Sequence, residues 1–233
     1  MPIVHRPAAE RGRTRLPWLD GRHSFSFGDY YDPSWLEWSA LRVLNDDRVA
    51  PGGGFPTHPH RDMEILTWVL DGSLEHKHSM GTGAVIRPGE AQVMRAGTGV
   101  THSEFNHSKN APVRLLQIWF PPRTHGLKPG YQQRPFPESE LHDNLRVVVS
   151  PDGRDGSLVI DQDVVVYVAR LSPEAAVTHA IAPGRRAWVQ VARGDVTVNG
   201  TRLAEGDGAG VRDEQLVAIA SPAGGEVLVF DLP

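Results

Sequence analysis

The chain has 233 residues, long enough for one large β domain or two modest ones. Its 24 basic and 28 acidic residues leave a formal charge of −4 without any block of like charge, which argues against nucleic acid as a partner. Cysteine is absent, which excludes disulfides, thiolate metal ligands and thiol nucleophiles.

The apolar segments are short along the whole chain. Residues 1–18 contain no continuous apolar run for a signal peptide or membrane span, so we expect a cytoplasmic protein without membrane contact. We also expect a monomer. Because 24 Gly and 19 Pro interrupt the apolar runs, the sequence predicts β structure with many turns and little helix. The expected strands, rich in Val, Ile, Leu or aromatic residues, are 64–70, 83–86, 91–94, 114–120, 146–149, 157–160, 164–169, 187–191, 196–198, 216–220 and 226–231.

A polar, Pro-rich segment divides the chain. Residues 121–137 (PPRTHGLKPGYQQRPFP) are the best candidate for a linker, which gives an N-terminal domain of residues 1–136 and a C-terminal domain of residues 137–233. The halves share a weak repeat, because WVLDGSLEH turns at Gly72 and VQVARGDVTV turns at Gly194. This order of strand, turn and strand is typical of a small antiparallel barrel or jelly roll built twice, although any two β hairpins share it.

Two short motifs carry the strongest chemical signal. His58 and His60 flank a proline, and His102 and Glu104 flank a serine. In an extended strand, residues i and i+2 point to the same face, so each motif places two ligands side by side. Imidazole and carboxylate are ligands of Fe, Mn, Ni, Cu and Zn. We therefore expect these four side chains to meet around one divalent ion.

Other histidines compete with this interpretation. His76 and His78 form a second i, i+2 pair, for which we expect a solvated or pocket-wall position rather than metal ligation. Glu64 follows His60 by four residues, so it is either a base or orienting group beside the metal or a buried carboxylate with satisfied hydrogen bonds. The histidines without a comparable partner, which we expect at the surface or in hydrogen bonds, are His5, His23, His107, His125, His142 and His179.

The second half lacks an equivalent pair of ligands. If Gly194 corresponds to Gly72, the positions matching His58 and His60 hold Ala180 and Ala182. We therefore expect a C-terminal barrel without a metal site, which is structural or forms an interface. Its predicted core includes Trp188, Val189 and Val191.

The quoted motifs resemble a known superfamily. GGGFPTHPHRDMEILTWVLDG is similar to the first cupin motif, and PGEAQVMRAGTGVTHSEFN is similar to the second. HSFSFGDYYDP, LRVLNDD, SPDGRDGS and EVLVFDLP extend the resemblance to the pirin family over nearly the whole chain, especially to its bacterial quercetin-dioxygenase-like members. The resemblance implies an all-β bicupin of two antiparallel jelly-roll barrels, with the metal in the N-terminal barrel only. It also implies three His and one Glu as ligands, on His58, His60, His102 and Glu104.

The number of protein ligands indicates which reactions the metal can support. A six-coordinate ion held by three His and one carboxylate keeps two open positions, which suit a small aromatic or enolisable substrate and dioxygen. The expected ion is Fe(II), with Zn, Mn, Ni and Cu as alternatives. Proton abstraction from a substrate hydroxyl is expected at Glu104 or Glu64. The resemblance implies an oxidoreductase of the quercetin 2,3-dioxygenase type, which opens a flavonol such as quercetin.

Two rival functions stay open at this point. The resemblance to pirins also allows a metal-containing binding or regulatory module without turnover. A third possibility is a cupin enzyme of another class, such as an isomerase or hydrolase that uses Zn or Mn as a Lewis acid. An ion that faces an open pocket favours an enzyme, whereas an ion sealed by side chains favours a structural role.

Overall fold

The computed structural model describes residues 3–81 and 83–233, and these residues are nearly all in strands and turns. Its short helical turns are η1 Ala8–Glu10, α1 Glu138–Leu141 and η2 Arg154–Gly156. The strands are β1 Ile3–Arg6, β2 Gly12–Leu16, β3 Leu19–His23, β4 Val43–Val49, β5 Gly54–His60, β6 Glu64–Asp71, β7 Leu74–His78, β8 Gly83–Ile86, β9 Glu90–Arg95, β10 Val100–Asn106, β11 Val113–Phe120, β12 Gly130–Pro135, β13 Arg146–Ser150, β14 Leu158–Val159, β15 Val165–Leu171, β16 Ala176–Ala180, β17 Arg186–Gly194, β18 Val196–Val198, β19 Thr201–Leu203, β20 Gly208–Val211, β21 Leu216–Ala220 and β22 Gly225–Leu232. The predicted all-β fold with little helix is confirmed. No helix in the described ranges is long and apolar enough to cross a membrane.

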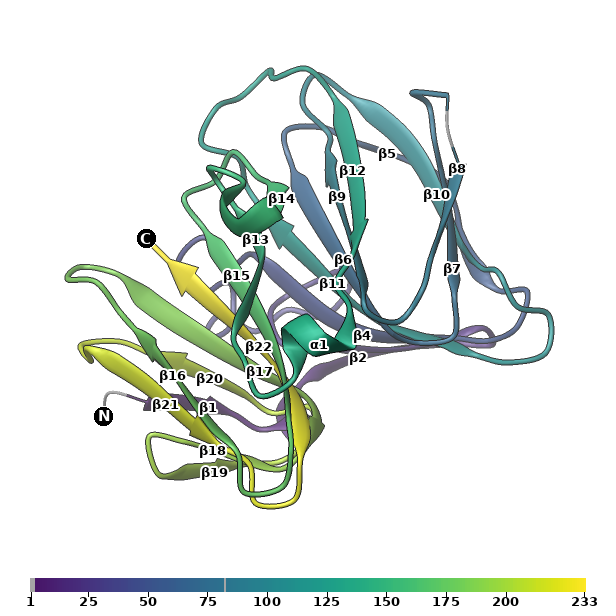
Figure 1. The fold of residues 1–233 in the computed structure, drawn as a ribbon. Helices are drawn as coiled ribbons and strands as arrows, with labels where there is room; N and C mark the ends of the chain where they lie inside the picture. The colour runs from purple at the N-terminus through teal and green to yellow at the C-terminus, as the bar shows by residue number, and fades with distance from the viewer. Residues whose placement is uncertain (1–2, 82) are drawn as a thin grey trace.

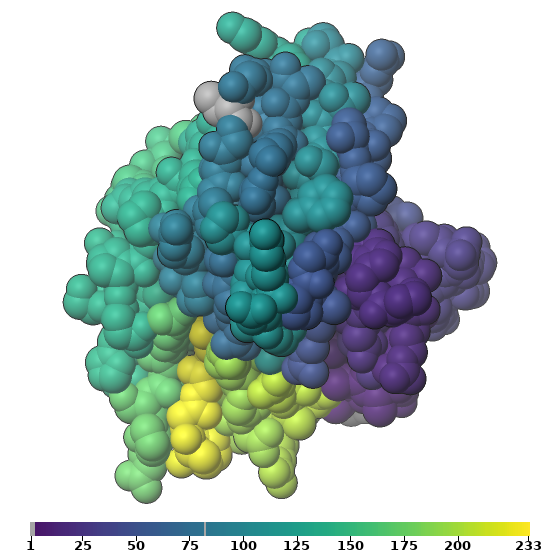
Figure 2. Space-filling view, turned by 90° about the vertical axis from the view of Figure 1, so that its right-hand side faces the viewer, coloured from purple at the N-terminus to yellow at the C-terminus, as the bar shows by residue number. Residues whose placement is uncertain are grey.

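The strands form two barrels, each built from a large and a small sheet (Figure 1). In the first barrel the described strands give a seven-stranded sheet in the order β12-β9-β6-β11-β4-β3-β2 and a four-stranded sheet β5-β10-β7-β8. In the second, they give the order β1-β20-β17-β22-β15-β13-β14 and a four-stranded sheet β16-β21-β18-β19. Figure 2 shows the face formed mainly by the first barrel, with the C-terminal half below it.

The two barrels repeat one plan. The central order β9-β6-β11-β4 of the first matches β20-β17-β22-β15 of the second, and β5-β10-β7-β8 matches β16-β21-β18-β19. The turn glycines correspond as well: Gly72 has φ 74° and Gly194 has φ 71°. An added Cβ would lie 2.5 Å from Pro112 O at Gly72 and 2.3 Å from Gly224 O at Gly194. Only glycine fits such a turn, where φ is positive and another loop packs closely.

One outermost strand, β1, lies in the barrel of the other half of the chain. The N-terminal strand β1 pairs with β20 of the second barrel, whereas β12 pairs with β9 of the first. The expected linker at 121–137 therefore contains an edge strand. This strand was missed because its sequence, GYQQRP, is polar and has no apolar alternation. The boundary between residues 136 and 137 stays a prediction, and it falls directly after β12.

A shared apolar core holds the barrels together. It combines Phe25, Trp68 and Phe120 of the first half with Trp188 and Phe230 of the second, all at most 1% exposed. Successive side chains of a strand point to opposite faces, so each large sheet packs one face on its own barrel and the other on the partner barrel. This explains why β6 is buried along almost its entire length.

Strand β11 shows how this arrangement positions the site. Its even-numbered apolar residues Leu116, Ile118 and Phe120 lie in the core shared by the barrels. Its alternate residues Gln117 and Trp119 line a cavity inside the first barrel. The rigid core between the barrels therefore fixes the back wall of that cavity.

Candidate metal centre

Strands β5 and β10 bring the two predicted motifs together. The strands are antiparallel neighbours, and His102 is directly opposite His58. The register shifts between His102 and Glu104, so a bulge interrupts the pairing within the second motif. Three of the four predicted ligands, His58, His60 and His102, place their ligand atoms within 4.8 Å of one another. This spacing allows the three imidazoles to hold one ion.

The histidine nitrogens are arranged for coordination. His58 Nδ1 lies 2.7 Å from Pro56 O, to which its N–H donates, so the Nε2 lone pair is left for a metal. Buried His60 Nε2 and His102 Nε2 have no hydrogen-bond partner within the described residues. Buried polar atoms are rarely left unpaired, and a divalent ion bound here would give both nitrogens a partner. The residues present therefore fit a divalent metal.

His76 lies behind this cluster. Its Nε2 is 2.8 Å from His102 Nδ1, and both residues are buried. With the proton on His102 Nδ1, His102 donates to His76 and keeps Nε2 for an ion. The His76 ring in turn stacks on Tyr131, with ring centroids 5.3 Å apart. His76 is fully buried rather than solvated, and it orients His102.

Glu104 belongs to a second group. It lies with His76 and His102 in a set whose ligand atoms are within 4.8 Å of one another, and His102 is common to both groups. Its carboxylate accepts hydrogen bonds from Gln117 Nε2 at 3.0 Å and from Gln92 Nε2 at 3.4 Å. These amides hold Glu104 behind the imidazoles. The structure therefore places Glu104 with His102, but not in the group that contains His58 and His60.

Burial sets the protonation states of the cluster. Together with the neighbouring histidines, it lowers the pKa of His60 to about 4 and that of His102 to about 2. The neutral imidazoles are the form that binds a metal. Burial has the opposite effect on an acid and raises the pKa of Glu104 to about 7, although Gln117 opposes the shift.

An apolar cavity opens beside the cluster. Its volume is about 360 Å³, and His58, His60 and Glu104 all line it. Its other walls are mostly aromatic and aliphatic, with a few polar groups: Phe27, Asn45, Asp47, Phe55, Pro56, Thr57, Leu74, Leu115, Gln117 and Trp119. An apolar pocket with a few convergent polar groups is typical of a small-molecule site. An ion held here would face the pocket rather than be sealed by side chains.

Comparisons with known proteins identify the family. The Pirin family model matches residues 5–120, and the model of the quercetinase C-terminal cupin domain matches residues 147–232. A relative from Escherichia coli (strain K12) named quercetin 2,3-dioxygenase is 47% identical over 231 residues, which cover 99% of this chain and 99% of that protein. The chain belongs to the pirin family. A pirin-like protein of Caulobacter vibrioides is 38% identical and covers 98% of this chain and 99% of its own length.

Solved pirin structures have the same two-barrel cupin fold. The crystal structure of YhhW from Escherichia coli matches with a TM-score of 0.96 at 47% identity, covering 99% of this chain and 97% of that chain. The structure of bacterial pirin YhhW in complex with nickel(II) matches with a TM-score of 0.95 and covers 99% of each chain. The predicted family and bicupin architecture are confirmed.

Glu64 lies elsewhere in this pirin. Its side chain is fully buried, and its carboxylate accepts hydrogen bonds from the backbone N–H groups of Asp161 at 2.7 Å and Gln162 at 2.9 Å. Asp62 has φ 46°, which breaks the extended chain between His60 and Glu64, so the strand alternation assumed in the prediction does not continue. Glu64 is not among the described residues that line the cavity. Its carboxylate joins the first barrel to a loop of the second half.

The second barrel of this pirin has apolar residues where the first has ligands. Strand β21 corresponds to β10, and its Val217 and Ile219 lie in an apolar core. His179 on β16 is bonded through Nε2 to Asp231 Oδ2 at 2.9 Å. Both groups that could hold a metal among the described residues belong to the first barrel. The predicted core residues Trp188 and Val189 are fully buried.

Sequence reasoning missed several residues of the site. Gln117 is a polar residue inside the apolar run LLQIWF, and this was the signal that could have singled it out. Its amide holds Glu104, and Thr67 Oγ1 donates to its Oε1 at 2.7 Å. Asp47 lies in the cavity wall, where burial and nearby acidic groups raise its pKa to about 8. No sequence pattern indicates that Asp47 faces the site, because its neighbours Asp46 and Arg48 are also polar.

Proposed function

We propose that this chain is a metal-dependent dioxygenase that cleaves a flavonol such as quercetin. The observation that carries the proposal is that His58, His60 and Glu104 line the same cavity as Phe27 and Trp119. A planar aromatic substrate can bind between the aromatic walls and reach the histidine cluster from there. The name of the 47% identical Escherichia coli relative, quercetin 2,3-dioxygenase, supports the same activity.

The proposed metal centre uses His58, His60, His102 and Glu104, and the proposed ion is Fe(II). When bound, a divalent ion would supply Lewis acidity toward the substrate hydroxyl and redox chemistry toward dioxygen. His76 and the carbonyl of Pro56 hold the imidazoles in the orientation that this requires. With one carboxylate ligand, the site would keep a net charge of +1, which favours an anionic phenolate or enolate.

Glu104 is the proposed acceptor of the substrate proton. Its carboxylate lines the cavity, and burial raises its pKa to about 7, which makes it a stronger base than an exposed glutamate. The amides of Gln117 and Gln92 hold it in place. The carboxylate of Glu64 accepts hydrogen bonds from the backbone of the second half, so we propose that Glu104 acts alone.

Flavonol consumption by metal-loaded protein tests the proposal. Quercetin absorbance would be followed under air and under nitrogen with Fe(II)-loaded protein. We expect consumption under air only, and none with His102→Ala. His107→Ala removes a half-exposed histidine that contacts Glu75, so it should retain full activity as a matched control.

Unchanged quercetin under air, with the metal site shown to be filled, would contradict the dioxygenase. The rival is a binding or regulatory module, which would hold the metal and bind the flavonol without turnover. Binding measured by fluorescence quenching in the same samples separates the two. The cytoplasmic location, the monomeric state and the absence of nucleic-acid and membrane partners stay predictions.

A further inference from the structure

A second cavity lies on the other side of strand β4. Along this strand Asn45 and Asp47 line the cavity of the proposed metal centre, whereas Asp46 and Arg48 line the second one. The second cavity has a volume of about 320 Å³. Residues of both halves enclose it, among them Arg114 of the first barrel and Glu205 of the second.

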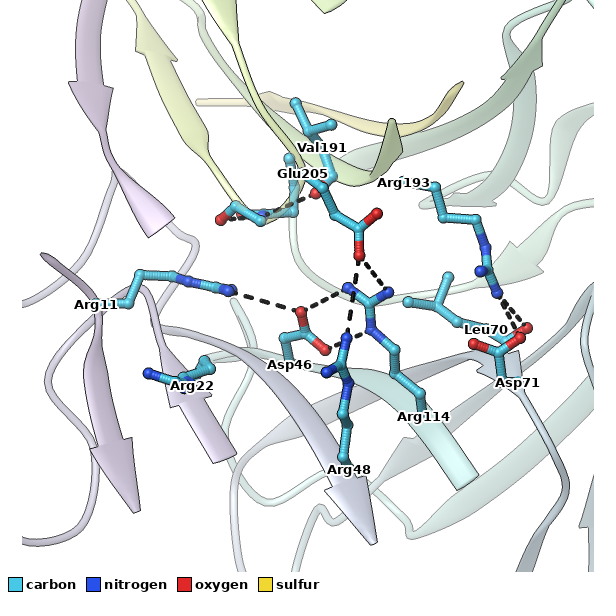
Figure 3. A network of polar contacts seen from close by, with 12 residues as sticks. Arg11, Arg22, Asp46, Arg48, Leu70, Asp71, Arg114, Val191, Arg193 and Glu205 are labelled. Atoms are coloured by element: carbon cyan, nitrogen blue, oxygen red, sulfur yellow. Dashed lines mark hydrogen bonds and ion pairs between the residues drawn. The ribbon is translucent and has the colours of Figure 1, made fainter. Parts of the chain in front are cut away.

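The cavity has more guanidinium groups than carboxylates. Its lining includes the four arginines Arg11, Arg22, Arg48 and Arg114, and the three acids Asp20, Asp46 and Glu205. The charged groups that face it therefore sum to +1. Figure 3 shows Asp46 between Arg11 and Arg114, with Glu205 on the far side of Arg114.

The carboxylates already have close partners. Arg114 binds Asp46 through two hydrogen bonds of 2.9 Å and donates a third, of 2.8 Å, to Glu205. Asp20 accepts bonds of 3.1 and 3.0 Å from Arg13. The acids of the cavity are therefore hydrogen-bonded mainly by Arg114 and by Arg13, which does not line the cavity. Arg22 and Arg48 make only longer ion pairs, of 3.5 Å to Asp20 and 4.0 Å to Glu205.

Arg11 is left without such a partner. Its side chain is 6% exposed, and its ion pair with Asp46 spans 3.7 Å, beyond hydrogen-bond distance. Its Nε and Nη1 have no hydrogen-bond partner among the described residues. Burial lowers its pKa, Asp46 and Asp207 partly oppose this shift, and the nearby Arg22 and Arg114 lower the pKa further. A buried guanidinium beside other guanidiniums is costly unless an anion accepts hydrogen bonds from its N–H groups.

We propose that this cavity binds a small tetrahedral oxyanion of the phosphate type. Four arginines from different segments line it: Arg11 at the end of η1, Arg22 on β3, Arg48 on β4 and Arg114 on β11. A phosphate presents oxygens in several directions and carries up to two charges, which suits arginines converging from several sides. A carboxylate presents two oxygens in one plane. The site is independent of the proposed flavonol chemistry.

Calorimetric titration of the metal-loaded full-length chain tests the site. The probes are inorganic phosphate, acetate and chloride at matched ionic strength. We expect saturable phosphate binding with one site per chain and a rise in melting temperature. Arg11→Gln should weaken phosphate binding at least about tenfold, because it removes a charged donor from a buried site.

Two further variants keep the test decisive. Arg202→Gln removes an arginine that is 80% exposed and paired with Asp195, so it should leave phosphate binding unchanged. Arg22 is 35% exposed, so Arg22→Gln should fold even if Arg11→Gln does not, and should weaken binding at least about threefold. Equal phosphate affinity in the wild type and both cavity variants would overturn the proposal. So would acetate binding as tight as phosphate binding, or a phosphate response without saturation.

Discussion

Replacing Glu64 by alanine separates a structural from a catalytic role for this buried carboxylate. The change removes acceptors at 2.7 Å and 2.9 Å from the backbone N–H groups of Asp161 and Gln162, and a 3.4 Å contact with Arg95. Hydrogen bonds to a charged group contribute about 1.5–3 kcal/mol each, so the loss of two should cost about 3–6 kcal/mol of the free energy of unfolding. For a chain of this size that corresponds to a fall in melting temperature of roughly 6–24 °C.

Urea denaturation followed by tryptophan fluorescence measures this cost. Glu64→Gln is the matched variant, because its amide keeps one acceptor oxygen, and it should lose about half as much stability. At a temperature where all three proteins are folded, metal content and flavonol turnover should equal those of the wild type. Stability within about 0.5 kcal/mol of the wild type combined with lost turnover would refute the reasoning, and would make Glu64 a base.

Three further outcomes follow from the site and from the contact between the barrels. His76→Phe removes the hydrogen-bond partner that lies 2.8 Å from His102. Metal affinity measured by chelator competition should fall about 10–100-fold. Unchanged affinity would show that His76 does not orient His102. Metal affinity should rise about tenfold per pH unit between pH 5 and 7 and level off above pH 7, because Glu104, with a pKa of about 7, must lose its proton before it binds the ion. Glu104→Gln should remove this pH dependence. A wild-type affinity that does not change with pH would contradict the prediction. Trp68→Phe removes the 2.7 Å hydrogen bond from Trp68 Nε1 to Glu226, which joins the two halves. Urea denaturation should show a loss of about 1.5–3 kcal/mol in the free energy of unfolding, with the metal site intact. A loss below about 0.5 kcal/mol would show that this bond does not hold the barrels together.

The sequence predicted the parts of the fold that depend on apolar runs. Strands such as β6 and β22 are apolar along their length because each lies between a barrel interior and the shared core. The edge strands β1 and β12 could not be found in this way. They are held mainly by backbone pairing with β20 and β9, which depends little on the side-chain pattern.

The positions of the site residues could be predicted from the sequence only where the local backbone conformation determines them. The i, i+2 spacing of His58 and His60 predicts their relative positions correctly, because β5 is extended through both residues. The same rule failed for Glu64, because Asp62 takes a positive φ between the two strands. The bond between His76 and His102 depends on the pairing of β7 with β10, which the sequence does not specify.

Metal content per chain tests the central claim most directly. Protein purified from its own host would be analysed by inductively coupled plasma mass spectrometry, beside a His58→Ala/His60→Ala double variant and a His107→Ala control. The proposed metal centre predicts one divalent ion per chain in the wild type and the control, and none in the double variant. An ion retained by the double variant at full stoichiometry would contradict it.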